Sequence, residues 1–137
     1  SRLNLSLREK NGLAYNVESS YNPYCDTGIF SIYFGTDAQY LNKSTSIALA
    51  ELKKLRTSKL GAIQLSKAKS QIKGYLARGY ENHESLMLSL GKSLLTFNKI
   101  ESIEHICKKI DDITAEHLLE ISNDIFEPSK LSTLIYV

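Results

Sequence analysis

Residues 7–35, LREKNGLAYNVESSYNPYCDTGIFSIYFG, contain the change from helical to strand periodicity that decides the fold class. Leu3 and Leu7, just upstream and at its start, have the i,i+4 spacing of one helix face. Asn11-Gly12 then forms a dipeptide typical of a helix end with left-handed backbone geometry. We therefore predict a helix over residues 1–11.

The rest of this stretch predicts a β-hairpin. Apolar and polar residues alternate from Leu13 onward, which places Leu13, Tyr15 and Val17 on one face of a strand. The turn-like sequence YNPYCD is followed by GIFSIYFG, which is aromatic and β-branched, with both faces substantially apolar. We predict an antiparallel hairpin over residues 13–35.

Downstream periodicity predicts a run of helices over about residues 38–126 and a final strand over residues 131–137. Asp37 offers an N-cap to the first helix of this run and Thr114 offers one to the last, which stops at Glu127-Pro128. The helices between them are expected at about residues 62–81, 83–97 and 103–110.

This order of elements predicts the α+β class, with an antiparallel sheet and helices packed on one of its faces. The length of 137 residues suits one domain. Three strands are few for a complete sheet, and the chain begins with Ser1 and not Met. We therefore expect residues 1–137 to be a single and partial domain, a piece of a longer protein.

Composition excludes several classes of function. A net charge of +2, with lysines interleaved among acidic residues, does not suit a protein that tracks nucleic-acid phosphates. No apolar run is long enough for a membrane span. Residues 1–137 contain no signal-peptide pattern, and a signal in a missing upstream part is left open. Cys25 and Cys107 have no CxxC spacing; we expect free thiols, with a single disulfide left open.

Neither the three histidines nor the adjacent aspartates Asp111 and Asp112 predict a metal site. His83, His105 and His117 are too far apart for the i,i+4 ligand pair of an HExxH helix, and exposed helix positions explain them. Asp111-Asp112 lies between two predicted helices, where complementarity to a helix N-terminus explains it. Phosphate loops, a serine elbow and a nucleophilic cysteine signature are also absent from the sequence.

Arg8 and Tyr15 remain as candidates with two interpretations. A cation in the last turn of a helix suits the helix dipole, and a tyrosine suits a strand face, so both residues could be structural. Alternatively, the intervening turn could bring both side chains to one rim, where they would donate hydrogen bonds to a carbonyl or a developing oxyanion.

The whole sequence resembles one known family. SRLNLSLREKNGLAYNV and YNPYCDTGIFSIYFGTD resemble the C-terminal-domain segment of pitrilysin/insulysin-type zinc metallopeptidases and mitochondrial processing peptidases. LSKAKSQIKGYLARGYENHESLMLSLGKSLL and IDDITAEHLLEISNDIFEPSKLSTLIYV resemble the helices and closing strand that follow in that family. The resemblance implies part of a metallopeptidase domain of the LuxS/processing-peptidase-like type.

In this family one domain or subunit carries zinc on an HxxEH motif, and a second supplies an arginine and a tyrosine in an R-x6-Y arrangement. Arg8 and Tyr15 match that arrangement. The resemblance thus implies that Tyr15 is catalytic, bonding the scissile carbonyl, and that Arg8 and Tyr15 bind substrate. HxxEH is absent, so the chain has no metal ligands or cofactor of its own, and zinc is expected in the partner. Departures at Asn4, Asn11 and Gly61 leave the substrate preference open.

The leading hypothesis is a C-terminal-domain fragment of a zinc peptidase, not catalytic as an isolated chain. It would bind peptide and stabilise the transition state for a metal site on an HxxEH-bearing N-terminal domain or subunit. The alternatives are a non-catalytic scaffold or substrate-recognition subunit of the same family, and an unrelated α+β binding module. The compartment stays open, with a soluble protein of the bacterial cytoplasm or periplasm favoured. Sequence upstream of Ser1 that contains HxxEH would favour the first hypothesis.

Overall fold

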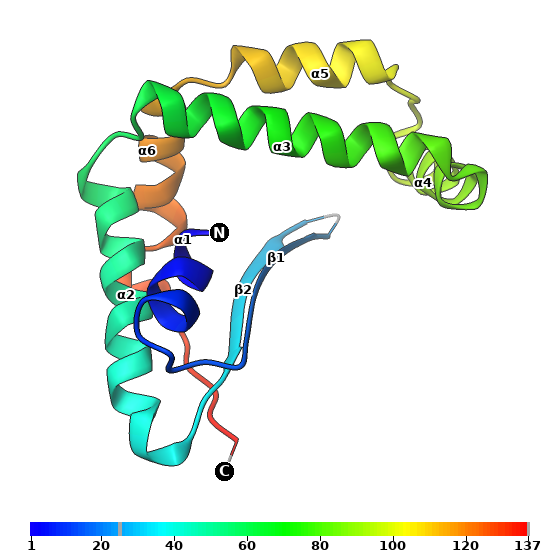
Figure 1. Cartoon of the computed structure of the whole chain (residues 1–137). Coiled ribbons are helices and arrows are strands. Elements are labelled where there is room, and N and C mark those ends of the chain that lie inside the picture. The colour runs from blue at the N-terminus through cyan, green and yellow to red at the C-terminus, as the bar shows by residue number, and fades with distance from the viewer. Residues whose placement is uncertain (25, 137) are drawn as a thin grey trace. The chain divides into compact units, whose positions relative to one another are not determined.

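The computed structural model describes residues 1–24 and 26–136. Its elements follow one another as α1 (Arg2–Asn4), η1 (Leu5–Glu9), β1 (Asn16–Pro23), β2 (Gly28–Gly35), η2 (Ala38–Tyr40), α2 (Leu41–Thr57), α3 (Ala62–Glu81), α4 (His83–Phe97), α5 (Ile103–Asp112), α6 (Ala115–Ile125) and η3 (Pro128–Lys130) (Figure 1). The chain divides into two compact units. The hairpin unit comprises Ser1–Lys59 and the segment from Leu119 onward, and the three-helix unit comprises Leu60–Leu118.

In the hairpin unit, β1 and β2 pair antiparallel from Asn16 opposite Gly35 to Pro23 opposite Gly28. Figure 1 shows them as a long curved hairpin. Val17 and its partner Phe34 lie on the same face of this hairpin as Ile32, because side chains alternate along each strand. This face packs against the helices of the unit.

The core of the hairpin unit is small and centred on Leu7. Leu7 is fully buried, and it clusters with Leu3, Ala14 and Ala48. The partly buried side chains around this cluster are Val17, Ile32, Phe34 and Ile47. Phe30 of β2 also meets Phe126, which follows α6, in an edge-to-face contact with ring centroids 5.0 Å apart.

The opposite face of the hairpin carries exposed side chains. Glu18 of β1 and its cross-strand partner Tyr33 of β2 lie on this face, together with Ile29. The side chain of Tyr33 is 61% exposed and that of Ile29 is 52% exposed. Among the described residues the sheet is therefore covered by helices on one face, and the predicted α+β class is confirmed.

The three-helix unit contains α3, α4 and α5, and α3 contacts both of the other helices. Side-chain caps begin two of these helices: Asn82 accepts the N–H of Ser85 at the start of α4, and Ser102 accepts the N–H of His105 at the start of α5. Asn98 ends α4 in the left-handed region. No described residue of these three helices is fully buried.

The C-terminal segment differs from its prediction. The strand predicted over residues 131–137 does not form over 131–136, which carry no sheet pairing. A strand obtains its backbone hydrogen bonds only from a neighbour, and β1 and β2 pair with each other in the described sheet. Thr114 does act as predicted, because its hydroxyl accepts the N–H of His117 at the start of α6.

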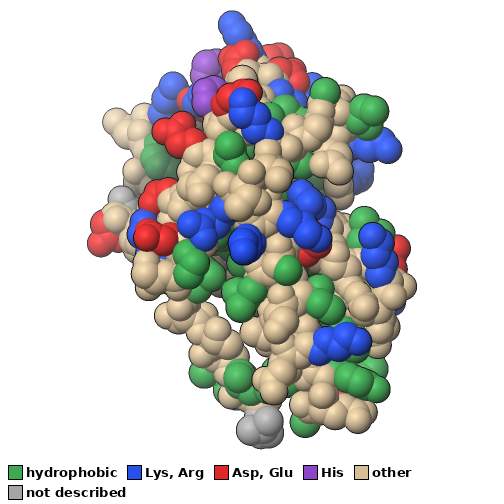
Figure 2. Space-filling view, turned by 90° about the vertical axis from the view of Figure 1, so that its left-hand side faces the viewer, with side chains coloured by type: hydrophobic (Ala, Val, Ile, Leu, Met, Phe, Trp, Pro, Cys, Tyr) green, Lys and Arg blue, Asp and Glu red, His purple; other side chains and the backbone are tan. Residues whose placement is uncertain are grey.

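Cys107 is a partly buried free thiol, whereas the prediction for Cys25 falls outside the described residues. None of the helices described here combines the length and the apolar character needed to cross a membrane. On the face shown in Figure 2, lysine and arginine side chains lie among acidic and apolar ones.

Candidate functional site

The helical segment that carries Arg8 has an unusual backbone. α1 continues into η1, a π-helical turn in which the N–H of Lys10 donates to the carbonyl of Leu5 at 2.9 Å. Such turns are rare and frequently occur at functional sites. Since a π turn holds more residues than an α turn, it rotates the side chain of Arg8 about the helix axis relative to a regular α-helix.

Gly12 closes this segment. Its φ of +60° lies in the left-handed region, as the Asn-Gly dipeptide predicts. The N–H of Gly12 donates to the carbonyl of Arg8, and the N–H of Leu13 donates to that of Leu7, both at 2.9 Å. These bonds resemble a Schellman closure widened by one residue. A Cβ at Gly12 would meet open space, so the backbone conformation is what favours glycine here.

Buried Glu51 anchors the same segment to α2. One of its carboxylate oxygens accepts from Ser6 of η1 at 3.1 Å and from Lys54 at 2.6 Å, and the other lies 3.4 Å from Arg2. Burial raises the pKa of Glu51, but the hydrogen bonds from Lys54 and Ser6 and the nearby positive charges outweigh it and leave the pKa below its ordinary value. Glu51 is therefore an ionised anchor for the Arg8-bearing helix.

Tyr15 follows two buried residues, Leu13 and Ala14, yet its own side chain is 72% exposed. The predicted alternation that placed Leu13 and Tyr15 on one face is wrong, because β1 begins only at Asn16. The backbone of Tyr15 is nevertheless fixed, since its N–H donates to the carbonyl of Gly35 at 3.0 Å.

The phenol of Tyr15 donates a hydrogen bond to Asp37 Oδ1 at 2.9 Å. This bond and the carboxylate charge raise the pKa of Tyr15 above its ordinary value. Asp37 occupies the predicted N-cap position, at the start of η2, but its side chain makes no cap hydrogen bond. The sequence predicted the position of Asp37 but not its partner, because no local pattern connects residues 22 positions apart.

Thr36 holds this part of the chain in place. Its hydroxyl donates to the carbonyl of Leu13 at 2.6 Å and lies 3.2 Å from the hydroxyl of Ser44. Ser44 belongs to α2 and is fully buried. The backbone segments that carry Tyr15 and Asp37 are therefore tied to each other and to α2.

Arg8 and Tyr15 lie on either side of the Gly12 turn, and both are exposed. Within residues 1–24 and 26–136, no hydrogen bond joins their side chains, and the Arg8 guanidinium has no hydrogen-bond or ion-pair partner. The structure thus presents one planar cation with several donors and one phenol donor, a set that suits carbonyl or carboxylate oxygens.

The histidines do not form a metal centre. Nε2 of His105 lies 3.7 Å from Glu101, and Nδ1 of His117 accepts from the backbone of Thr114. In the described parts of the chain no three histidine, cysteine, aspartate or glutamate side chains are grouped to hold a metal ion. The residues present therefore do not fit a zinc site.

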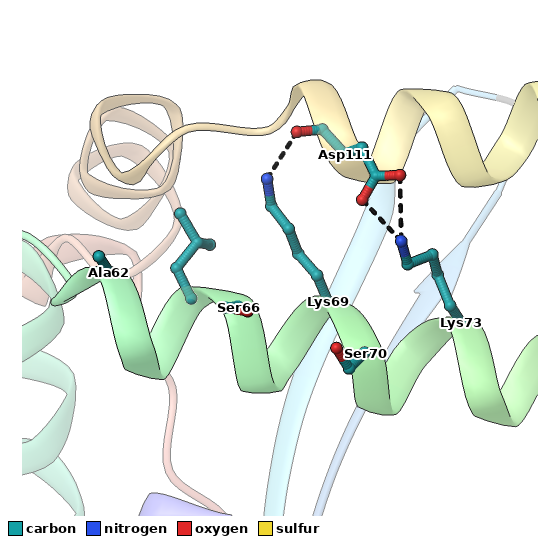
Figure 3. A pocket seen from close by; sticks show the side chains of 7 residues that line it. Ala62, Ser66, Lys69, Ser70, Lys73 and Asp111 are labelled. Carbon is teal, nitrogen blue, oxygen red and sulfur yellow. Dashed lines mark hydrogen bonds and ion pairs between the residues drawn. The ribbon is translucent and has the colours of Figure 1, made fainter.

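Asp111 has a structural role at the end of α5. Figure 3 shows Lys69 and Lys73 extending from α3 toward it. Lys73 donates to both carboxylate oxygens of Asp111, at 2.8 and 3.0 Å, and Lys69 donates to its backbone carbonyl at 2.6 Å. Asp111-Asp112 ends α5, so the predicted match to a helix N-terminus is wrong, and the lysines supply the charge that suits a C-terminus.

Glu101, between α4 and α5, is surrounded by cations. Lys109 donates to both of its carboxylate oxygens, at 2.7 and 2.8 Å, and Lys99 donates at 3.1 Å. These hydrogen bonds, led by that of Lys109, lower the pKa of Glu101 from 4.5 to about 2.

Acid should therefore weaken the three-helix unit through Glu101. A lowered folded-state pKa contributes stability that is fully present above the unfolded value of 4.5 and is lost as the pH falls toward about 2. We expect Glu101→Gln to flatten the pH dependence of the unfolding free energy across this window, measured by urea unfolding at several pH values. Glu81→Gln, an exposed control in α3 of the same unit, should retain the wild-type slope. Superimposable profiles of Glu101→Gln and wild type would contradict the assignment.

Comparisons with a family model and with curated proteins point to the same family of peptidases. The family described as "Peptidase M16 inactive domain" matches residues 1–72. An uncharacterized zinc protease of Bacillus subtilis, YmxG, is 30% identical over 135 residues, which cover 98% of this chain and 33% of that protein. An uncharacterized zinc protease of Rickettsia bellii is 33% identical over 98% of this chain and 32% of its own length. The chain thus spans about a third of the length of these relatives.

Two solved structures share the fold. Complex III2 from Candida albicans, with Inz-5 bound, contains a chain that matches 90% of this one with a TM-score of 0.79 and 22% identity, over 29% of that chain. A conserved protein from Enterococcus faecalis matches 90% of this chain with the same TM-score and 21% identity, over 28% of its own length.

Proposed function

Because this chain belongs to the M16 peptidase family, through that family's inactive domain, we propose that it binds peptide and stabilises the transition state for a zinc site on a partner. The partner would be an HxxEH-bearing N-terminal domain or subunit. The observation that carries the proposal is the R-x6-Y pair, in which Arg8 and Tyr15 flank the Gly12 turn with both side chains exposed.

Tyr15 would act on the scissile carbonyl of the bound peptide. Negative charge develops on that oxygen as the carbonyl carbon becomes tetrahedral, and a fixed donor stabilises it more in the transition state than in the ground state. The hydroxyl of Tyr15 is protonated at neutral pH, because a tyrosine pKa is ordinarily 10.0 and that of Tyr15 is raised above this value, so the hydroxyl can donate. The backbone bond from Tyr15 to Gly35 would keep the donor in place.

Arg8 would hold the peptide. A guanidinium stays charged at all relevant pH values and presents donors in a plane that matches a carboxylate or two carbonyl oxygens. Its helix is tied to α2 through Glu51, which pairs with Arg2 and accepts a hydrogen bond from Ser6, so the cation projects from a braced element. This contact would form before the chemical step and persist through it.

Zinc would provide the activated water in this family, and the described residues offer no ligand set for it. The partner would therefore supply every zinc ligand. What this chain contributes is restricted to the two donors, Arg8 and Tyr15.

Replacing Arg8 with alanine should raise KM for peptide cleavage about tenfold and leave kcat within about threefold, because uniform binding is lost. The assay uses the assembled enzyme, in which this chain acts with the HxxEH-bearing half. Lys10→Ala removes an exposed cation two residues away and should have no such effect. An unchanged KM in Arg8→Ala would refute the role of Arg8. An assembled protein that binds peptide without cleaving it would instead favour a non-catalytic recognition subunit.

A further inference from the structure

We infer that Asp37 restrains Tyr15: its carboxylate is the resting acceptor of the Tyr15 hydroxyl and competes for it with the substrate carbonyl. The inference rests on the proposed function of Tyr15. It adds a residue that would set how readily the phenol becomes available to substrate.

The competition follows from the hydrogen-bonding capacity of a phenol. A tyrosine hydroxyl has one proton to donate, and Tyr15 donates it to Asp37 Oδ1 at 2.9 Å. Donation to a scissile carbonyl would require the same proton. Substrate must therefore replace Asp37 as the acceptor before Tyr15 can stabilise an oxyanion.

The contact is fixed by its surroundings and is not a by-product of helix capping. Asp37 stands at the N-cap position of η2 but makes no cap bond, so Tyr15 is the partner of its side chain. The backbone of Tyr15 is held by its N–H bond to the carbonyl of Gly35, and the backbone of Asp37 is held by the N–H of Tyr40, which donates to its carbonyl at 2.9 Å. The donor and the acceptor are thus set opposite each other by the hairpin.

The negative charge of Asp37 restrains Tyr15 in two ways. An ionised acceptor binds a hydroxyl more strongly than a neutral one, which makes release of the proton to substrate less favourable. A nearby carboxylate also opposes any increase of negative charge on the phenol oxygen, as the raised pKa of Tyr15 reflects. Both effects weaken donation to an oxyanion, so removal of the charge should strengthen it.

The test is Asp37→Asn in the assembled enzyme, because asparagine keeps the size of the side chain and can accept only as a neutral group. We expect kcat/KM for peptide cleavage to rise about two- to fivefold. The same change in a Tyr15→Phe background should have no effect. In parallel, NMR titration of ring-labelled tyrosine, with the Tyr15 signal identified by its loss in Tyr15→Phe, should show its pKa falling toward 10.0. Glu18→Gln, a charge removal elsewhere on the hairpin, should change neither reading.

Each contrary outcome has a separate meaning. An unchanged Tyr15 pKa in Asp37→Asn would show that Asp37 does not hold the hydroxyl and would overturn the inference. A lowered pKa with unchanged or reduced kcat/KM would overturn the competition while leaving the proposed function intact. If Tyr15→Phe alone cleaves peptide as well as wild type, the proposed function fails and this inference fails with it.

Discussion

Replacing Tyr15 with phenylalanine is expected to lower kcat for peptide cleavage by about two to three orders of magnitude in the assembled enzyme, while KM changes little. This is the loss typical of removing one fixed oxyanion donor, because the interaction exists fully only in the transition state. The substitution removes only the hydroxyl group. The ring of Tyr15 is 72% exposed, so the change should leave the fold intact.

Steady-state kinetics on a quenched fluorescent peptide would measure this effect, with far-UV circular dichroism as a check on folding. Tyr33→Phe is the matched control, because Tyr33 is another exposed tyrosine of the same hairpin, 61% exposed. It should cleave peptide at the wild-type rate. Equal rates for Tyr15→Phe and Tyr33→Phe would exclude Tyr15 from the reaction.

Replacing Leu7 with alanine is expected to lower the unfolding free energy of the hairpin unit by about 3–4 kcal/mol. Leu7 has no exposed surface and is the most deeply buried side chain of the cluster it forms with Leu3, Ala14 and Ala48. Few other buried apolar residues can compensate for the resulting cavity. Since small domains are stable by only about 5–15 kcal/mol, much of the stability of this unit depends on Leu7.

Urea unfolding followed by circular dichroism would measure the loss, because the chain contains no tryptophan for fluorescence. Leu5→Ala is the matched control: Leu5 lies in the same π turn and also has a carbonyl that closes the helix, but its side chain is 45% exposed. We expect a loss below about 1 kcal/mol there. Similar losses for the two variants would mean that Leu7 is not the centre of this core.

Resemblance along the sequence predicted the family, and the comparisons with known proteins confirm it. The α+β class is also confirmed. It could be predicted because helical and strand periodicities are local, and the residues that produce them are adjacent in the chain. The roles assigned to Arg8 and Tyr15 are predictions that the experiments above address.

Tertiary structure alone decided what surrounds the candidate residues. The sequence by itself determined the turn at Gly12, because left-handed geometry is a property of one residue and its neighbours. It did not determine that Tyr15 points outward to Asp37, or that Glu51 braces Ser6 from 45 residues away. Such pairings depend on which segments the folded chain brings together, and no local period records them.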